Sequence, residues 1–188
     1  MGVSGLAAGM ALSSLQALIA VPAWLLARAT LPGSTAFDAA MRMVAVALAL
    51  ATSVTLLLVN TTSNDVLCAI PMAWAIALAV LPRDAAAGRW LTPARSVALS
   101  GLFAGAAVAG KLSNGPIAIL LPLLWLCAAS GIAPRLRLVL VGSVATLLAF
   151  AACYGYWGWQ LWERFGNPVY PLYDHHFALV RGWTGWSP

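Results

Sequence analysis

Asp65 is the acidic residue whose position in the sequence points most directly to chemistry. It ends a polar patch, residues 60–65, that separates two apolar runs. Asparagine and aspartate at the start of a helix accept hydrogen bonds from its free N–H groups, so Asp65 fits an N-terminal cap. A carboxylate where an apolar segment begins is also a candidate contact for a polar substrate. Both roles stay open, and the second makes Asp65 the candidate catalytic residue.

Lys111 ends another apolar run, directly before a polar turn that contains Asn114 and leads to Pro116. A lysine at such a position can extend its ammonium group to lipid headgroups along its flexible stem. It can instead bind a phosphate, because Pro116 favours the start of a helix and the free N–H groups of a helix start attract anions. The second interpretation makes Lys111 and Asn114 candidate substrate-binding residues.

The C-terminal part of the sequence is rich in aromatic residues. Residues 154–165 carry Tyr and Trp at short intervals, among them Trp159 and Trp162. Such rings prefer a membrane–water interface, since one end of each ring is apolar and the other is polar. The adjacent Glu163 and Arg164 are expected to form a surface salt bridge rather than an acid–base pair.

The last polar motifs predict neither a metal site nor a helix. Residues 166–173 contain two prolines at a three-residue spacing, which favours an extended and stiff segment. His175 and His176 follow Asp174, but adjacent histidines in a strand or turn point apart. A metal site needs three or four convergent ligands, so no metal-binding residues are expected here.

Composition determines what kind of elements must position these residues. The chain has 188 residues, of which 8% are charged and 62% hydrophobic, and its formal net charge is +5. Soluble domains are about 25% charged, and small domains leave much of their surface exposed to water. We therefore expect an all-α integral membrane protein. This composition also excludes disorder, a collagen and a nucleic-acid partner. A secreted disulfide scaffold is excluded because the three cysteines lie in apolar runs.

The apolar runs predict about six transmembrane helices, each near the roughly 20 residues that span a bilayer. Residues 1–157 would form this bundle, and residues 158–188 an aromatic interfacial tail. Thr92 and Pro93 predict a helix start, as N-cap and first helical residue. Gly101 and Gly105 predict a face for close helix packing. The expected spans are residues 5–27, 43–59, 66–82, 93–112, 116–130 and 138–156.

Basic residues predict the orientation of the bundle. The loops after the first, third and fifth spans contain all the basic residues before the tail except Lys111. Because cytoplasmic loops are enriched in arginine and lysine, these loops are expected in the cytoplasm of a bacterial inner membrane. The patch 60–65, the turn after Lys111 and the tail then lie on the non-cytoplasmic side. The arginines in question are Arg28, Arg42, Arg83, Arg89, Arg95, Arg135 and Arg137.

Three sequence pieces together resemble the GT-C superfamily of bacterial multi-span, glycosyltransferase-like membrane proteins. The tail piece runs from Trp157-Gly158-Trp159 through Trp162 to Phe165-Gly166-Asn167-Pro168-Val169-Tyr170-Pro171. Asn64-Asp65 resembles a helix start of that family, and Gly110-Lys111-Leu112-Ser113-Asn114 resembles its Gly-Leu-Lys-Leu-Thr-Asn turn. The pieces occur in the family's order over residues 44–177.

The resemblance implies transfer of a sugar from a polyprenyl-phosphate donor to an acceptor on the non-cytoplasmic face. It would bring Lys111 near the donor phosphate, while Asn167, Trp159 and Trp162 would shape an interfacial pocket. Asp65 would contact the sugar or a metal, or act as general base for the acceptor. The implied partners are the lipid bilayer and the donor. No cofactor is indicated, and a divalent metal is left open.

The chain also departs from the family. GT-C enzymes carry their key acidic residue in a large outer loop after the first span, whereas the first outer segment here is the short stretch before Gly5. The chain thus resembles the middle and late parts of such a protein, and whether it is an enzyme by itself stays open. The alternative is a non-catalytic membrane subunit or a small transporter. Transport is disfavoured because Asp65, Lys111 and Glu163 lie at helix ends.

Overall fold

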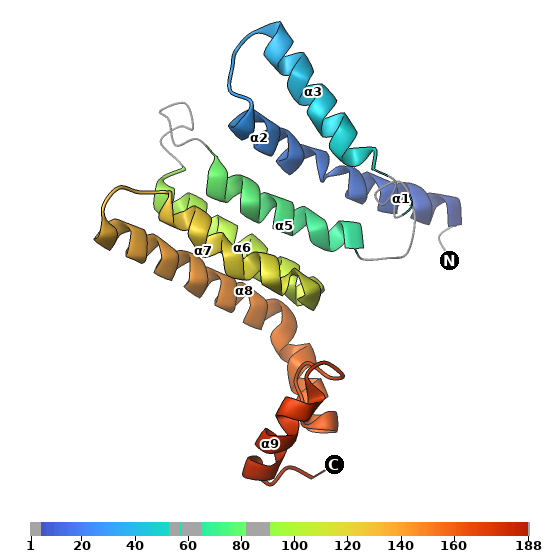
Figure 1. Ribbon diagram of the computed structural model, residues 1–188. Coiled ribbons are helices and arrows are strands. Elements are labelled where there is room, and N and C mark those ends of the chain that lie inside the picture. The colour runs from blue at the N-terminus through green and yellow to red at the C-terminus, as the bar shows by residue number, and fades with distance from the viewer. Residues whose placement is uncertain (1–4, 53–56, 58–64, 82–90, 188) are drawn as a thin grey trace.

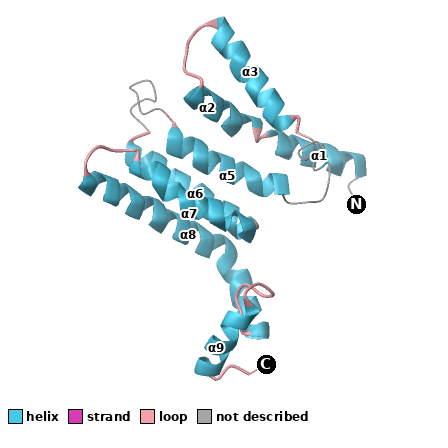
Figure 2. Ribbon diagram, in the orientation of Figure 1, coloured by secondary structure: helices cyan, strands magenta, loops and turns pink. Residues whose placement is uncertain are grey.

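A computed structural model describes residues 5–52, 57, 65–81 and 91–187, and all the regular elements in these residues are helical (Figures 1 and 2). This confirms the all-α prediction. The helices form a stack in which α1 to α3 lie on one side of α5 and α6 to α8 on the other (Figure 1). The elements are α1 (Gly5–Ala17), α2 (Ala20–Thr30), α3 (Ala36–Leu50), α5 (Asp65–Val80), α6 (Pro93–Gly110), the 3₁₀ turn η2 (Leu112–Asn114), α7 (Gly115–Leu126), α8 (Ile132–Phe165) and α9 (Asp174–Thr184).

The helix lengths differ from the six predicted spans. Two stretches of the described residues are long and apolar enough to cross a membrane, namely Ala7–Thr30, which joins α1 and α2, and Ile132–Phe165, which is α8. Helices α5 and α7 are apolar but have only 16 and 12 residues. As described, each is shorter than the roughly 20 residues of a span. Several predicted features lie outside the described residues, namely part of the second span, the patch 60–64, Arg83 and Arg89.

Helix α3 begins earlier than predicted because a capping box starts it. The Thr35 hydroxyl accepts a hydrogen bond from the Asp38 backbone N–H at 3.1 Å, and the Asp38 carboxylate accepts one from the Thr35 N–H at 2.9 Å. This reciprocal pair satisfies two of the free donors of the first turn. Arg42, expected in a loop, therefore lies inside α3. It is buried and donates to the carbonyl oxygens of Leu31 and Gly33, which fastens α3 to the end of α2.

Buried hydroxyl groups join α5, α6 and α7. Ser96 and Ser100 of α6 donate to the carbonyl oxygens of Leu78 and Ala75 in α5, each at 2.6 Å. The indole N–H of Trp125 in α7 in turn donates to the Ser100 hydroxyl at 3.0 Å. Such contacts satisfy polar groups where no water is present. Helix α6 begins at Pro93 with Thr92 as its N-cap, which confirms the predicted start.

The glycine face of α6 makes the predicted close helix contact, and its partner is α8. A Cβ atom on Gly101 would overlap the carbonyl oxygen of Gly142, and one on Gly105 would overlap that of Thr146. Only residues without a side chain allow two helix backbones to approach this closely. The contact fixes α8 against the centre of the stack.

Helix α8 is longer than the predicted span 138–156. Its 34 residues continue through Phe165, and the helix bends away from the stack before it ends (Figure 1). Gly166 then adopts a left-handed conformation, with φ of 61°, which glycine tolerates at a helix C-terminus. The following residues form turns rather than the predicted extended segment, and α9 is a helix that the sequence analysis missed.

Candidate functional site

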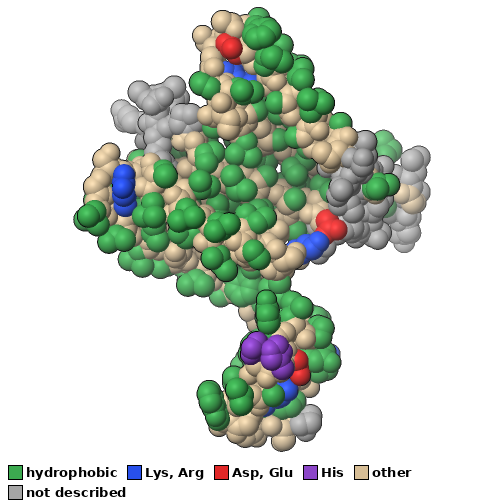
Figure 3. Space-filling view, in the orientation of Figure 1, with side chains coloured by type: hydrophobic (Ala, Val, Ile, Leu, Met, Phe, Trp, Pro, Cys, Tyr) green, Lys and Arg blue, Asp and Glu red, His purple; other side chains and the backbone are tan. Residues whose placement is uncertain are grey.

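Asp65 and Lys111 form an ion pair at one end of the stack. Asp65 is the first residue of α5 and Lys111 is the C-cap of α6, and these antiparallel helices bring the two residues together. The side chains are 33% and 38% exposed, so both charged groups remain accessible from one side. Figure 3 shows adjoining acidic and basic side chains at this end of the helices. Two residues proposed separately from the sequence thus belong to one site.

Asn114 lies beside the ion pair and ties three elements together. It belongs to η2 and donates from its side-chain amide to the carbonyl oxygen of Ala107 at 3.0 Å and to that of Cys68 at 3.4 Å. The Ala107 oxygen also accepts the backbone N–H of Lys111 at 3.0 Å. Asn114 therefore holds the end of α6 against α5 and fixes the backbone on which Lys111 stands.

The site combines groups that suit an anionic ligand. The ammonium group of Lys111 can donate to phosphate oxygens, and helix α7 begins at Gly115, with Pro116 in its first turn. The Gly115 N–H already donates to the Leu112 carbonyl oxygen and Pro116 has no N–H, so the start of α7 contributes mainly its positive dipole end. Asp65 offers a carboxylate in hydrogen-bonding contact with the ammonium group, so any anion must compete with it.

An apolar groove begins next to this site. It lies between α7 and α8, has a volume of about 520 Å³, and runs from Gly115 past Ile119 to Trp125. Thr146 and Phe150 form part of its α8 side. The groove therefore links the turn after Lys111 with the apolar middle of the stack.

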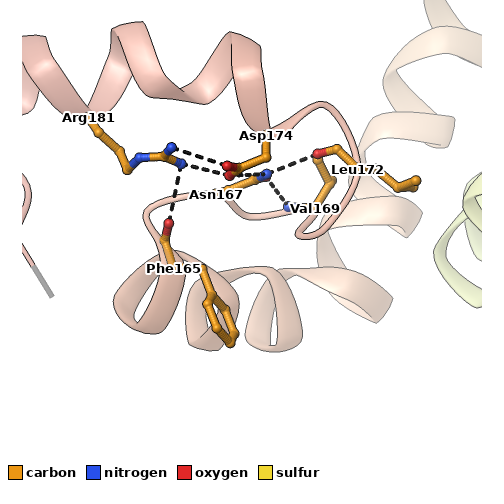
Figure 4. Close-up of polar contacts among 6 residues, drawn as sticks. All are labelled: Phe165, Asn167, Val169, Leu172, Asp174 and Arg181. Carbon is orange, nitrogen blue, oxygen red and sulfur yellow. Dashed lines mark hydrogen bonds and ion pairs between the residues drawn. The ribbon is translucent and has the colours of Figure 1, made fainter.

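Asn167 is fully buried at the start of the tail, and its side chain organises the following turn. Its amide oxygen accepts the backbone N–H of Val169 at 2.9 Å (Figure 4). Its amide nitrogen donates to the carbonyl oxygen of Leu172 at 2.9 Å and to the Asp174 carboxylate at 3.3 Å. The bond to Val169 adds to backbone turn contacts from the Tyr170 N–H to the Asn167 carbonyl oxygen at 3.3 Å and from the Leu172 N–H to the Val169 carbonyl oxygen at 2.9 Å. Together they explain why the two nearby prolines do not produce an extended segment.

A bidentate ion pair between Asp174 and Arg181 lies within α9, and the bonds of these two side chains to Phe165 and Asn167 hold the helix against the end of α8. The guanidinium nitrogens donate to the two carboxylate oxygens at 2.8 and 3.2 Å, and one of them also donates to the carbonyl oxygen of Phe165 at 3.4 Å (Figure 4). The sequence analysis missed this pair. A spacing of seven residues, two helical turns, was the available signal.

The tail residues proposed from the sequence lie apart from the Lys111 site. Trp159 is exposed and Trp162 is half-buried on the last turns of α8. In the described part of the chain, no hydrogen bond or ion pair joins Asn167, Trp159 or Trp162 to Lys111 or Asn114.

His175 and His176 lie in the first turn of α9 rather than in a strand or turn. Their ring centroids are 3.7 Å apart, so the rings do not point away from each other as predicted. Among the described residues, no group of three or more His, Cys, Asp or Glu side chains is arranged to hold a metal. At the Lys111 site, Asp65 is the described acidic residue that could contact a divalent metal.

Acidification is expected to loosen α9. Hydrogen bonds from Arg181, and then from Asn167, lower the pKa of Asp174 below its ordinary value. A carboxylate with a lowered folded-state pKa stabilises the folded form above its unfolded pKa of about 3.9 and loses that contribution as pH falls further. The protection factors of the α9 amides, which express exchange relative to the intrinsic rate at each pH, should therefore fall as the pH drops from about 5 to about 3.

The variant Asp174→Asn is the control for this pH dependence. It keeps the shape of the side chain but has no charge to titrate, so the protection factors of its α9 amides should be low throughout the same range. Parallel pH profiles for the wild type and the variant would contradict the assignment to Asp174.

The described residues thus define an all-helical protein with a half-exposed Lys–Asp pair at one end and a separately anchored C-terminal helix. A comparison of the chain with protein-family models, with curated proteins and with solved structures finds no match. The function must therefore be inferred from the site and the sequence motifs.

Proposed function

We propose that the chain is embedded in a bacterial inner membrane with the six-span topology predicted from its sequence. The two long apolar helices support this, because only 17% and 22% of their apolar windows are buried within the protein. The core helix of a soluble protein would be mostly buried. Large apolar side chains also cover much of the visible surface of the stack (Figure 3). Helices α5 and α7 would then complete their spans through their flanking residues.

The distribution of charge supports the proposed orientation. Arg28 lies in the last turn of α2, Arg95 in the first turn of α6, and Arg135 in the first turn of α8. These helix ends lie at the end of the stack opposite to Asp65 and Lys111 (Figure 1). With the arginines in the cytoplasm, the Lys111 site faces the non-cytoplasmic side.

We further propose that the protein is glycosyltransferase-like and uses a polyprenyl-phosphate sugar as donor. The observation that carries this proposal is the convergence of Asp65, Lys111 and Asn114 from three elements at one end of the stack. Lys111 would bind the donor phosphate together with the first turn of α7, and the adjoining apolar groove would accommodate part of the lipid. Asp65, once released from Lys111, would act as general base for the acceptor hydroxyl.

A transfer assay with labelled polyprenyl-phosphate sugar in membranes tests the proposal. Lys111→Ala and Asp65→Ala should each lower transfer by at least about 100-fold, as expected for a donor-phosphate contact and a general base. Arg135→Ala changes a cation at the opposite end of the stack and serves as the matched control. Insertion of each variant is measured separately by its recovery in the membrane fraction.

Two results would overturn the proposal. Unchanged transfer in both variants would refute the assignment of Asp65 and Lys111 as the transfer site. Absence of transfer in the unaltered protein, with insertion intact, would favour the second candidate function, a non-catalytic membrane subunit. One observation supports that candidate, since Asp65 and Lys111 neutralise each other and can join α5 to α6 without any ligand.

A further inference from the structure

The C-terminal segment after α8 carries unusually little charge. Among residues 166–188, Asp174 and Arg181 are the only Asp, Glu, Lys or Arg residues. A soluble segment of that length would have about six charged residues. The two that are present form a bidentate pair with each other, so the segment offers no uncompensated charge from these residue types.

The two faces of α9 have different surroundings. Asp174, Phe177 and Arg181 are spaced by three and four residues, lie on one face and are half-buried. His176, Leu179 and Trp183 follow the same spacing on another face and are exposed. Leu179 is 65% exposed and Trp183 is 83% exposed. We call these three residues the outer stripe.

The buried face of α9 is fastened to the end of α8. Arg181 and Asp174 point from α9 toward Asn167 and the Phe165 carbonyl group (Figure 4). Gly166 contributes by its lack of a side chain, since a Cβ atom there would lie 2.5 Å from the Cδ atom of Arg181. These contacts fix which face of α9 is turned outward.

We infer that α9 is a membrane-interface helix whose outer stripe is buried at the boundary between lipid headgroups and acyl chains. Helix α8 measures about 51 Å along its bent axis at 1.5 Å per residue, whereas a bilayer hydrocarbon core measures about 30 Å. Its last turns and α9 thus leave the core at the interface. Tryptophan and leucine on one face are the side chains that interfacial helices insert.

A lipid interface suits the outer stripe better than a protein partner does. The stripe has no Asp, Glu, Lys or Arg through which a charged partner could be oriented, whereas indole and imidazole rings meet both apolar chains and polar headgroups. The histidines lie on the exposed surface of this unit (Figure 3). The inference depends on the membrane embedding proposed above and is independent of the donor site.

Spin labelling of the full-length protein in lipid vesicles tests this inference. In a background with Cys68, Cys127 and Cys153 changed to Ser, single labels are placed at Leu179→Cys and Trp183→Cys. Ser34→Cys, between α2 and α3, gives the value for water, and Leu147→Cys on the exposed face of α8 gives the value for lipid. The accessibility to oxygen relative to a nickel chelate should be about threefold higher at positions 179 and 183 than at position 34.

The outcomes separate this inference from the proposed function. An accessibility ratio at position 183 equal to that at position 34, with a lipid-like ratio at position 147, would overturn the interfacial helix and leave the proposed embedding intact. If the accessibility ratio at position 147 also equals the value for water, the proposed embedding fails as well. Magnetic broadening between labels at position 183 of different molecules would mean that a second copy covers the stripe, which also overturns the inference.

A variant of the anchoring pair provides an independent measurement. Arg181→Ala removes the contacts to Asp174 and Phe165, so the accessibility ratio at position 183 should fall by about half toward the value for water. An unchanged ratio at both labelled positions would show that the pair does not orient the outer stripe.

Discussion

Gly105→Leu is expected to disrupt the packing of α6 on α8 and to destabilise the protein by about 3 kcal/mol. The Gly105 Cα faces the backbone of α8, where an added Cβ atom would overlap the Thr146 carbonyl oxygen and lie 2.8 Å from the Ala149 Cβ atom. A backbone carbonyl group cannot rotate out of the way as a flexible side chain can, so the two helices must separate. The measurement is unfolding in mixed detergent micelles, followed by circular dichroism.

Gly155→Leu is the matched control for this substitution. Gly155 is also a helical glycine, in α8, but nothing lies within 4 Å of the position that its Cβ atom would occupy. The added side chain should therefore not destabilise the protein, and the higher helix propensity of leucine should raise its stability by about 0.5–1 kcal/mol. Equal unfolding midpoints for the two variants would contradict the close contact between α6 and α8.

Local signals were sufficient to predict several parts of the fold. Thr92 and Pro93 specify a helix start through a hydroxyl cap and a fixed φ angle, which depend on neighbouring residues alone. The spacing of Gly101 and Gly105 predicted a close helix contact, although it could not identify α8 as the partner. Lys111 and Asn114 were proposed as binding residues because a lysine and a polar turn interrupt an apolar run, and that role stays a prediction.

Contacts between distant residues explain what the sequence did not reveal. Arg42 reaches carbonyl groups at the end of another helix, so its sequence position suggested a loop. The Asp65–Lys111 pair joins residues far apart in the chain and depends on how α5 and α6 are aligned. The Asp174–Arg181 pair joins residues only seven positions apart, and it was missed because the two prolines before it favoured an extended segment rather than a helix.

Changes to Lys111 and Asp65 are expected to move the affinity for polyprenyl phosphate in opposite directions. Lys111→Ala should weaken binding by about 10- to 100-fold, since a hydrogen bond to a charged group contributes roughly 1.5–3 kcal/mol. Asp65→Asn should strengthen binding by up to about fivefold, because the ammonium group no longer has to leave a carboxylate, and a partly exposed ion pair is worth up to about 1 kcal/mol. Binding is measured with polyprenyl phosphate and protein in lipid nanodiscs.

The opposite signs distinguish a ligand site from a structural ion pair. If the pair serves only to join α5 and α6, both variants should destabilise the protein. Both should then weaken binding, for that one reason. If Lys111 binds the phosphate, Asp65→Asn should combine tighter donor binding with a loss of sugar transfer, because the asparagine amide cannot accept the proton of the acceptor hydroxyl. A decrease in both variants, or no change in either, would contradict the assignment of Lys111 to the donor phosphate.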